Sequence, residues 1–263
     1  WENLQIIFST SAGDVRRNAL SDFTNVRSNG KIAMDLPEDV ELVNARIANE
    51  DEDVMLVTNS GRAIRFSTTE VRVFKGRKST GVRGIRLSEK DRVVSMSIIR
   101  HFKANTDERV AYLKMRRAVA GAVDEENVVD DEEVSENATI SPDRYAEMSA
   151  SENLILTISA TGSGKLSSSH DYPVRGRGGV GVAAIDKTMR GGELVASFPV
   201  EIDDQIMLAT SNGQSIRVPV DGISFRSRSA GGVKVFNTGK NEEVVSVARI
   251  ADQSDQDHHE DRN

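Results

Sequence analysis

The chain has 263 residues, a formal net charge of −7 and no cysteine, and 38% of its residues are hydrophobic. The length suffices for one large all-β domain or two ordinary domains. The lack of cysteine excludes disulfides and thiolate metal sites and fits a reducing cytosol. No apolar run approaches the length that spans a bilayer, so we do not expect a membrane protein. The chain begins Trp1-Glu2-Asn3, with no initiator methionine, basic region or apolar region. This argues against a signal peptide and suggests a piece of a longer protein.

The negative charge is concentrated in two segments. Residues 103–151 hold 12 acidic and 6 basic residues, and residues 251–263 hold 5 acidic residues and 1 basic residue. The rest of the chain therefore carries a net charge of +3. We interpret 103–150 as an acidic insertion and 251–263 as an acidic disordered tail, which together conceal a mildly basic body.

In chain order, one strand–turn–strand pattern occurs four times. Each copy is an apolar strand, a small polar turn that contains glycine, and a second strand that carries a basic residue. The turn glycines are Gly13, Gly61, Gly162 and Gly213. Further along each copy come a second glycine and an apolar closing strand. The second glycines are Gly30, Gly81, Gly179 and Gly232.

The spacing of the copies predicts the fold. Matched residues recur at about 50 residues, and the one doubled interval contains the insertion. Four β-segments in a unit of this length are typical of a propeller blade. A β-sandwich would explain the strands and turns but not the fourfold order. We therefore predict an all-β, propeller-like domain over residues 1–250, with four-stranded blades at about 1–50, 51–102, 151–202 and 203–250.

The insertion combines a predicted helix with an acidic run. The helix is ERVAYLKMRRAVAGAV (108–123), and DEENVVDDEEVSEN (124–137) follows it. One interpretation is a solvated, partly disordered excursion. The other is an interaction arm, or a DNA mimic that competes for the basic surface. His101 and His170 are isolated in the sequence, and His258 and His259 lie in the tail, where the alternative to a solvated tail is a weak adventitious metal site. We therefore expect no metal site.

Two glycine-rich stretches resemble nucleotide-binding loops but lack what such loops need. In SATGSGKLSS (159–168), Ser159 stands where a P-loop requires its first glycine, and Leu166 stands where a P-loop requires its final Ser or Thr. GRGGVG (176–181) fits G-x-G-x-x-G, but strand and turn residues follow it instead of a helix. We therefore expect neither a nucleotide hydrolase nor a dinucleotide site, and we interpret 159–168 as the hairpin of the third copy.

Basic residues recur at matched places in the copies: after the first turn, in the loop before the second glycine, and just after that glycine. The candidate DNA-binding residues are Arg16, Arg17, Arg27, Lys31, Arg62, Arg65, Lys75, Arg77, Lys78, Arg83, Arg86, Lys165, Arg175, Arg177, Arg217, Arg226, Arg228 and Lys234. We expect them to form a band around the outside. Aromatic residues do not alternate with them, which disfavours a stacking platform for single strands. The pattern indicates a sequence-nonspecific track for duplex DNA, and an ordinary solvated surface is the alternative.

Several segments resemble the C-terminal domain of the DNA gyrase A subunit, part of a bacterial type IIA topoisomerase. They are VMLVTNSGRAIRF (54–66), TGVRGIRL (80–87), DRVVSM (91–96), DQIMLATSNGQSIRV (204–218) and EEVVSVARI (242–250). The resemblance covers residues 1–102 and 151–250, and TGVRGIRL is shared with the topoisomerase IV relatives of that family.

The resemblance implies a β-pinwheel, a disc of propeller-like blades that exchange strands with their neighbours, with duplex DNA wrapped along a basic perimeter. It implies no catalytic centre and no cofactor in this chain, since ATP and Mg are used elsewhere in a holoenzyme whose negative supercoiling the wrap supports. The implied partners are duplex DNA, the gyrase B subunit, and the rest of the gyrase A subunit, in the bacterial cytoplasm and at the nucleoid. The isolated domain is expected to be a monomer.

The chain departs from that family in two ways. The family usually has six blades, whereas this chain has four, which resemble the last four. The glutamine-led basic box of the first blade is missing. The equivalent domain of topoisomerase IV and a propeller-like protein-interaction scaffold are the alternative functions.

Overall fold

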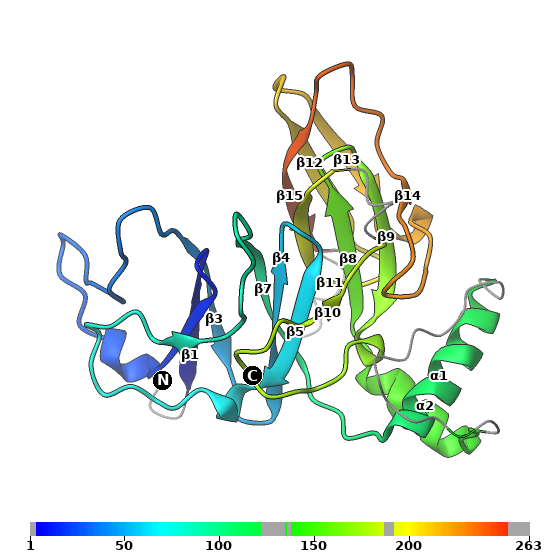
Figure 1. Cartoon of the computed structure of the whole chain (residues 1–263), viewed down its shortest axis with the longest axis horizontal. Coiled ribbons are helices and arrows are strands. Elements are labelled where there is room, and N and C mark those ends of the chain that lie inside the picture. Colours follow the sequence, from blue (N-terminus) through cyan, green and yellow to red (C-terminus); the bar gives the residue numbers. More distant parts are fainter. Residues whose placement is uncertain (1–3, 122–134, 136–137, 187–191, 252–263) are drawn as a thin grey trace, which may run out of the picture.

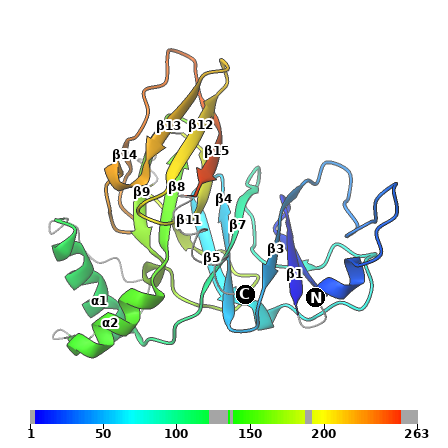
Figure 2. The ribbon, with the colours of Figure 1, turned by 180° about the vertical axis from the view of Figure 1, so that it is seen from behind.

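The computed structural model describes residues 4–121, 135, 138–186 and 192–251. Four small antiparallel sheets lie side by side in an arc, and a pair of helices projects at one side (Figures 1 and 2). The all-β, propeller-like fold predicted from the repeats is confirmed. In the described residues, no helix is long and apolar enough to cross a membrane.

Each repeat contributes a similar series of elements, with a short 3-10 helix (η) after its second strand, and the second to fourth repeats add a two-residue strand. The first repeat holds β1 (Gln5–Thr10), β2 (Asp14–Ala19), η1 (Leu20–Phe23) and β3 (Leu42–Ala48). The second holds β4 (Glu52–Thr58), β5 (Arg62–Ser67), η2 (Thr68–Glu70), β6 (Val82–Arg83) and β7 (Val93–Arg100). The third holds β8 (Leu154–Ser159), β9 (Ser163–Ser168), η3 (Ser169–Asp171), β10 (Val182–Ala183) and β11 (Leu194–Val200). The fourth holds β12 (Gln205–Thr210), β13 (Ser215–Pro219), η4 (Val220–Gly222), β14 (Val233–Lys234) and β15 (Val244–Ile250).

Neighbouring repeats exchange a strand. The sheet orders are β3-β1-β2-β6, β10-β5-β4-β7, β11-β8-β9-β14 and β13-β12-β15. The two-residue strands β6, β10 and β14 therefore each complete the sheet of the preceding repeat. In every sheet the closing strand (β3, β7, β11 or β15) lies at the inner edge, and these four strands contact one another in series. The second strand of each repeat faces the opposite, outer edge.

The glycine before each donated strand allows this exchange. Gly81 has a φ of 99°, and a Cβ added there would lie 2.2 Å from the carbonyl oxygen of Val15 in the first repeat. In the third repeat the matching glycine is Gly181, with a φ of 69° and an added Cβ 2.3 Å from the oxygen of Ala63. The sequence alignment of the copies on Gly179 is therefore wrong by two residues.

The hydrophobic core is divided into layers between neighbouring sheets. Ile7 and Val15 of the first repeat cluster with Val54 and Phe66 of the second. Equivalent clusters join the second repeat to the third and the third to the fourth. Small aliphatic residues suit these thin layers, which accounts for a fold with 5% aromatic residues.

The insertion contains a helical hairpin, α1 (Thr106–Val119) and α2 (Pro142–Ser151). Asn105 and Glu108 form a capping box at the start of α1, and Ser141 caps α2. Tyr112 of α1 and Met148 of α2 are buried together, and the Tyr112 ring packs edge-on against His170 of η3. The helix predicted in this segment exists, but most of the acidic run 124–137 and all of the tail except Ala251 lie outside the described residues.

Candidate nucleic-acid interface

The outer edge of the arc contains one loop from each of the second, third and fourth repeats. Loops 72–81, 173–181 and 223–232 run from the 3-10 helix of a repeat to its donated strand, and we call them the rim loops. Each begins beside the second strand of the preceding repeat, through the parallel bridges Arg17↔Val73, Arg65↔Val174 and Leu166↔Phe225. The rim loops therefore cross every junction between repeats.

The rim loops and the strands that follow them carry basic residues and no acidic ones. Residues 71–87, 173–185 and 222–236 contain no aspartate or glutamate. Of the eighteen predicted DNA-binding residues, eight are exposed: Arg27, Lys75, Lys78, Arg83, Arg86, Arg175, Arg217 and Lys234. Five are half-buried: Lys31, Arg62, Arg77, Arg177 and Arg226.

The remaining five lie inside the protein: Arg16, Arg17, Arg65, Lys165 and Arg228. Each exposes at most 3% of its surface. The expectation that all eighteen residues lie on the outside is therefore wrong for these five. A buried cation needs hydrogen-bond acceptors in place of water, and carbonyl groups of neighbouring repeats supply them.

Arg17 and Arg65 make the same contacts in successive repeats. The Nη1 group of Arg17 donates to the Thr68 oxygen at 2.9 Å, and that of Arg65 donates to the Ser169 oxygen at 2.7 Å. Both acceptors are the first residue of the next repeat's 3-10 helix. Arg65 also pairs through Nε with Asp53 Oδ2 at 2.7 Å. These arginines fasten one repeat to the next.

Arg16 and Lys165 make a second kind of junction contact. The Nη1 group of Arg16 donates to the Ser79 oxygen at 2.6 Å, and Lys165 Nζ donates to the Ala230 oxygen at 2.6 Å. Ser79 and Ala230 occupy the same place, two residues before the glycine of the donated strand. Burial lowers the pKa of Arg16, partly opposed by Asp22, and the nearby Arg77 lowers it further.

Arg77, Arg177 and Arg228 form a third matched set, each four residues before the glycine of its donated strand. Their Nη1 groups donate to the carbonyl oxygens of Ile32, Arg83 and Ala183 in the preceding repeat. The acceptors are themselves matched residues, two positions after that repeat's own glycine. The recurrence of basic residues thus has two physical causes, fastening between repeats and exposure on the rim.

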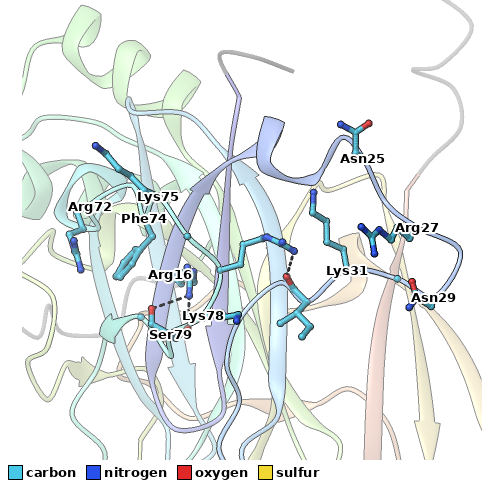
Figure 3. A pocket seen from close by; sticks show the side chains of 15 residues that line it. Arg16, Asn25, Arg27, Asn29, Lys31, Arg72, Phe74, Lys75, Lys78 and Ser79 are labelled. Carbon is cyan, nitrogen blue, oxygen red and sulfur yellow. Dashed lines mark hydrogen bonds between the residues drawn. The ribbon is translucent and has the colours of Figure 1, made fainter.

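The first two repeats line an open basic hollow of about 1580 Å3. Lys31 and Arg27 line it from the first repeat, and Lys75 and Lys78 from the second (Figure 3). Among the described residues, none that lines the hollow is acidic. It is wide and lined by backbone and cationic groups, so an anion with several charges suits it better than an apolar ligand.

Sequence reasoning missed Arg72, which also lines this hollow. Its guanidinium lies 4.2 Å from the centre of the Phe74 ring, and that of Arg16 lies 4.9 Å from it. Phe74 is therefore held between two arginines and is not offered to a nucleobase. Arg72 lies at the start of the same basic loop, which is the signal that could have found it. Among the described residues, no cluster of His, Asp and Glu could hold a metal ion.

Comparison with known proteins gives consistent matches. The family model "DNA gyrase C-terminal domain, beta-propeller" matches residues 5–49, 52–100, 153–200 and 204–251, and leaves out the helical insertion. The DNA gyrase A subunit of Granulibacter bethesdensis is 44% identical over 94% of this chain and 28% of that protein. The DNA gyrase A subunit of Rickettsia bellii is 40% identical over 99% of this chain, again 28% of that protein. The chain thus spans about 28% of the length of these relatives.

Two solved structures share the fold. A DNA gyrase A C-terminal domain aligns with a TM-score of 0.66 and 21% identity over 95% of this chain and 67% of that one. The C-terminal domain of DNA topoisomerase IV aligns with a TM-score of 0.69 and 20% identity over 94% of this chain and 62% of that one.

Proposed function

The chain belongs to the family of DNA gyrase C-terminal β-propeller domains, and on this premise we propose that it binds duplex DNA along its rim, without reading base sequence, and bends it into a wrap. In the whole protein this module would act as part of the gyrase A subunit, together with the gyrase B subunit, and support ATP-driven negative supercoiling. The curated relatives at 44% and 40% identity support the gyrase assignment. The likeness to topoisomerase IV is one of fold alone.

The observation that carries the proposal is the row of exposed cations on successive rim loops and donated strands. Lys75, Arg175 and Lys234 come from three different repeats and lie on segments without an acidic residue. DNA phosphates form a continuous line of negative charge, so cations repeated along an arc can follow the duplex. A wrapped duplex is bent, and an arc of repeats offers such a curved path.

The chemistry of the rim supports binding without base recognition. In the major groove, base edges are read by an α-helix or a two-stranded β-ribbon, and the described rim loops carry neither. Long cationic side chains on glycine-rich loops are instead suited to phosphate oxygens. Phe74, the aromatic residue of the second repeat's rim loop, is 8% exposed and is covered by arginines.

The energetics fit a wrap that depends on salt. If all eight exposed candidates each neutralise one phosphate, the slope of log K against log salt is about −7. Smooth bending of 20–30 base pairs by 40–90° costs about 1–6 kcal/mol. The free energy of phosphate binding should therefore exceed the cost of bending the duplex at low ionic strength. It should fall below that cost as the salt concentration rises.

The test is the salt dependence of duplex binding, measured by fluorescence anisotropy with two unrelated DNA sequences. The variant K75Q/K78Q should reduce the slope by about 0.9 for each residue and should weaken both duplexes equally. K240Q is the matched control, because Lys240 is exposed but lies in the turn before β15, away from the rim loops. Binding insensitive to salt, or an equal effect of K240Q, would contradict the proposal and favour a protein-interaction scaffold.

A further inference from the structure

The third matched set of arginines has a geometry that simple exposure does not explain. We call Arg77, Arg177 and Arg228 the rim clamp. The Nη1 group of Arg77 donates to Ile32 at 2.7 Å, and that of Arg177 donates to Arg83 at 3.0 Å. Arg228 makes the equivalent bond to Ala183. One side chain from each of the second, third and fourth repeats thus holds the segment that follows the matched glycine in the repeat before it.

The clamp of the third and fourth repeats has a second bond. The Nε group of Arg177 donates to the Glu70 oxygen at 2.9 Å, and that of Arg228 donates to the Asp171 oxygen at 2.8 Å. Glu70 and Asp171 are the last residues of η2 and η3. Each guanidinium therefore spans two separate segments of one neighbour. A planar fork of fixed donors suits this task, and a lysine ammonium does not reproduce it.

The clamp lies at the opposite edge of the sheets from the inner-strand contacts between repeats. The inner strands β3, β7, β11 and β15 contact one another at the inner edge of the arc, whereas the clamp lies on the rim loops at the outer edge. The hydrophobic layers hold neighbouring sheets together, and contacts at both the inner and the outer edge restrict the angle between two sheets. Beside Arg177, the amides of Arg86 and Gly178 donate across the same junction to Gly179 and Gly84 at 2.8 and 2.6 Å.

We propose that the rim clamp is a positioning device for DNA bending. It fixes the angle between neighbouring repeats and so sets the curvature of the rim that the duplex follows. The clamp arginines act through the neighbouring backbone, while exposed cations such as Lys75 contact phosphate. This inference rests on the proposed function, since curvature matters only if the rim bends DNA.

The experiment compares R177K with K75Q in the full-length protein that carries this chain. R177K keeps the positive charge but loses the fork. Its affinity for a duplex of about 20 base pairs and its salt slope should stay within about twofold of wild type. At saturation on a duplex of about 60 base pairs, energy transfer between dyes on the two ends should fall, because the duplex is bent less. K75Q should show the opposite pattern. It should bind the short duplex more weakly, but its energy transfer on the long duplex at saturation should equal that of wild type.

Hydrogen exchange in the absence of DNA measures the stability of the contacts that hold the second and third repeats together. In R177K the amides of Arg86 and Gly178 should exchange about tenfold faster, as expected for loss of a hydrogen bond to a charged group. In K75Q they should not change. If R177K proves unstable, R77K is the second variant, because the Nη1 group of Arg77 makes the matching bond to Ile32 at the preceding junction.

Three results would overturn the inference. One is unchanged energy transfer in R177K at saturation. Another is a loss of short-duplex affinity in R177K equal to that in K75Q, which would make Arg177 a phosphate contact. The third is a wild-type protein that does not bend the duplex at all. That result would remove the proposed function as well, and the hydrogen-exchange measurement would still report whether Arg177 fastens the repeats.

Discussion

Replacement of Arg65 by methionine is expected to destabilise the fold by about 3–5 kcal/mol, because it breaks a buried ion pair from one side. The side chains of Arg65 and Asp53 expose 2% and 0% of their surface, and Nε lies 2.7 Å from Oδ2. A loss of this size is a large part of the about 5–15 kcal/mol that holds a typical domain folded.

The magnitude follows from what is left behind. Asp53 would keep its contact with His101, whose Nδ1 lies 2.9 Å away and whose side chain is 39% exposed. The carbonyls of Ser169 and Arg100 would lose donors that now lie at 2.7 and 2.9 Å. Burial lowers the pKa of Arg65, and Asp53 opposes that shift, so the two charges depend on each other for stability.

The assay is urea unfolding of the chain followed by far-ultraviolet circular dichroism. The R65M variant should unfold at a clearly lower urea concentration. The double variant R65M/D53L should recover part of the loss, since it leaves no uncompensated buried charge. If R65M costs less than about 1 kcal/mol, the value typical of exposed pairs, the ion pair is not buried in solution and the reasoning is wrong.

Two other predictions concern the junctions and the insertion. The pKa of His170 is lowered by burial and by the nearby Arg65, against a hydrogen bond to the Met148 carbonyl that raises it. The unfolded chain therefore binds the proton more readily, so stability is full above about pH 6.5 and is lost as the pH falls toward the lower folded-state pKa. The urea midpoint of wild type should fall between pH 7.5 and about 5.5, and that of H170Q should fall less. If the midpoints of the two proteins change equally with pH, His170 is not the cause. Gly162 and Gly213 both have a positive φ, but an added Cβ would lie 2.4 Å from the Phe236 oxygen at Gly162 and meet nothing within 4 Å at Gly213. G213A should cost about 1–2 kcal/mol of backbone strain and G162A clearly more in the same unfolding assay, and equal costs would mean that the donated strand does not cover Gly162.

The repeats and the main strands could be predicted because they depend on local patterns. Apolar runs of strand length, with glycine turns between them, specify hairpins regardless of what lies beyond. The donated strands are different, since β6 consists of Val82 and Arg83 alone and has no pattern of its own. Strand exchange was expected from the family resemblance alone. The other strands of the sheet that β6 joins, β3, β1 and β2, belong to the preceding repeat.

The second helix of the insertion was not predicted, although the sequence carries a signal for it. Ser141, Pro142 and Asp143 are an N-cap, a first-turn proline and a first-turn acid, and α2 begins there. Its partner α1 was predicted, but with its start two residues late. The capping Asn105 and Glu108 mark the true start.

The candidate site could be predicted only in part, because basic residues serve two purposes here. Spacing shows that Arg175 and Arg177 recur in a rim loop, yet Arg175 is exposed and Arg177 binds two carbonyls of another repeat. Nothing in the residue type separates these roles. The distinction depends on where the carbonyl groups of the neighbouring repeat lie, and that is a property of the assembled arc.

The most direct test of the account is closure of a nicked plasmid by ligase in the presence of increasing amounts of the protein, followed by deproteinisation and measurement of linking number. Wrapping along the rim with the hand that supports negative supercoiling predicts a positive shift that grows with bound protein and disappears at high salt. Binding that saturates the plasmid without any shift in linking number would contradict the wrap.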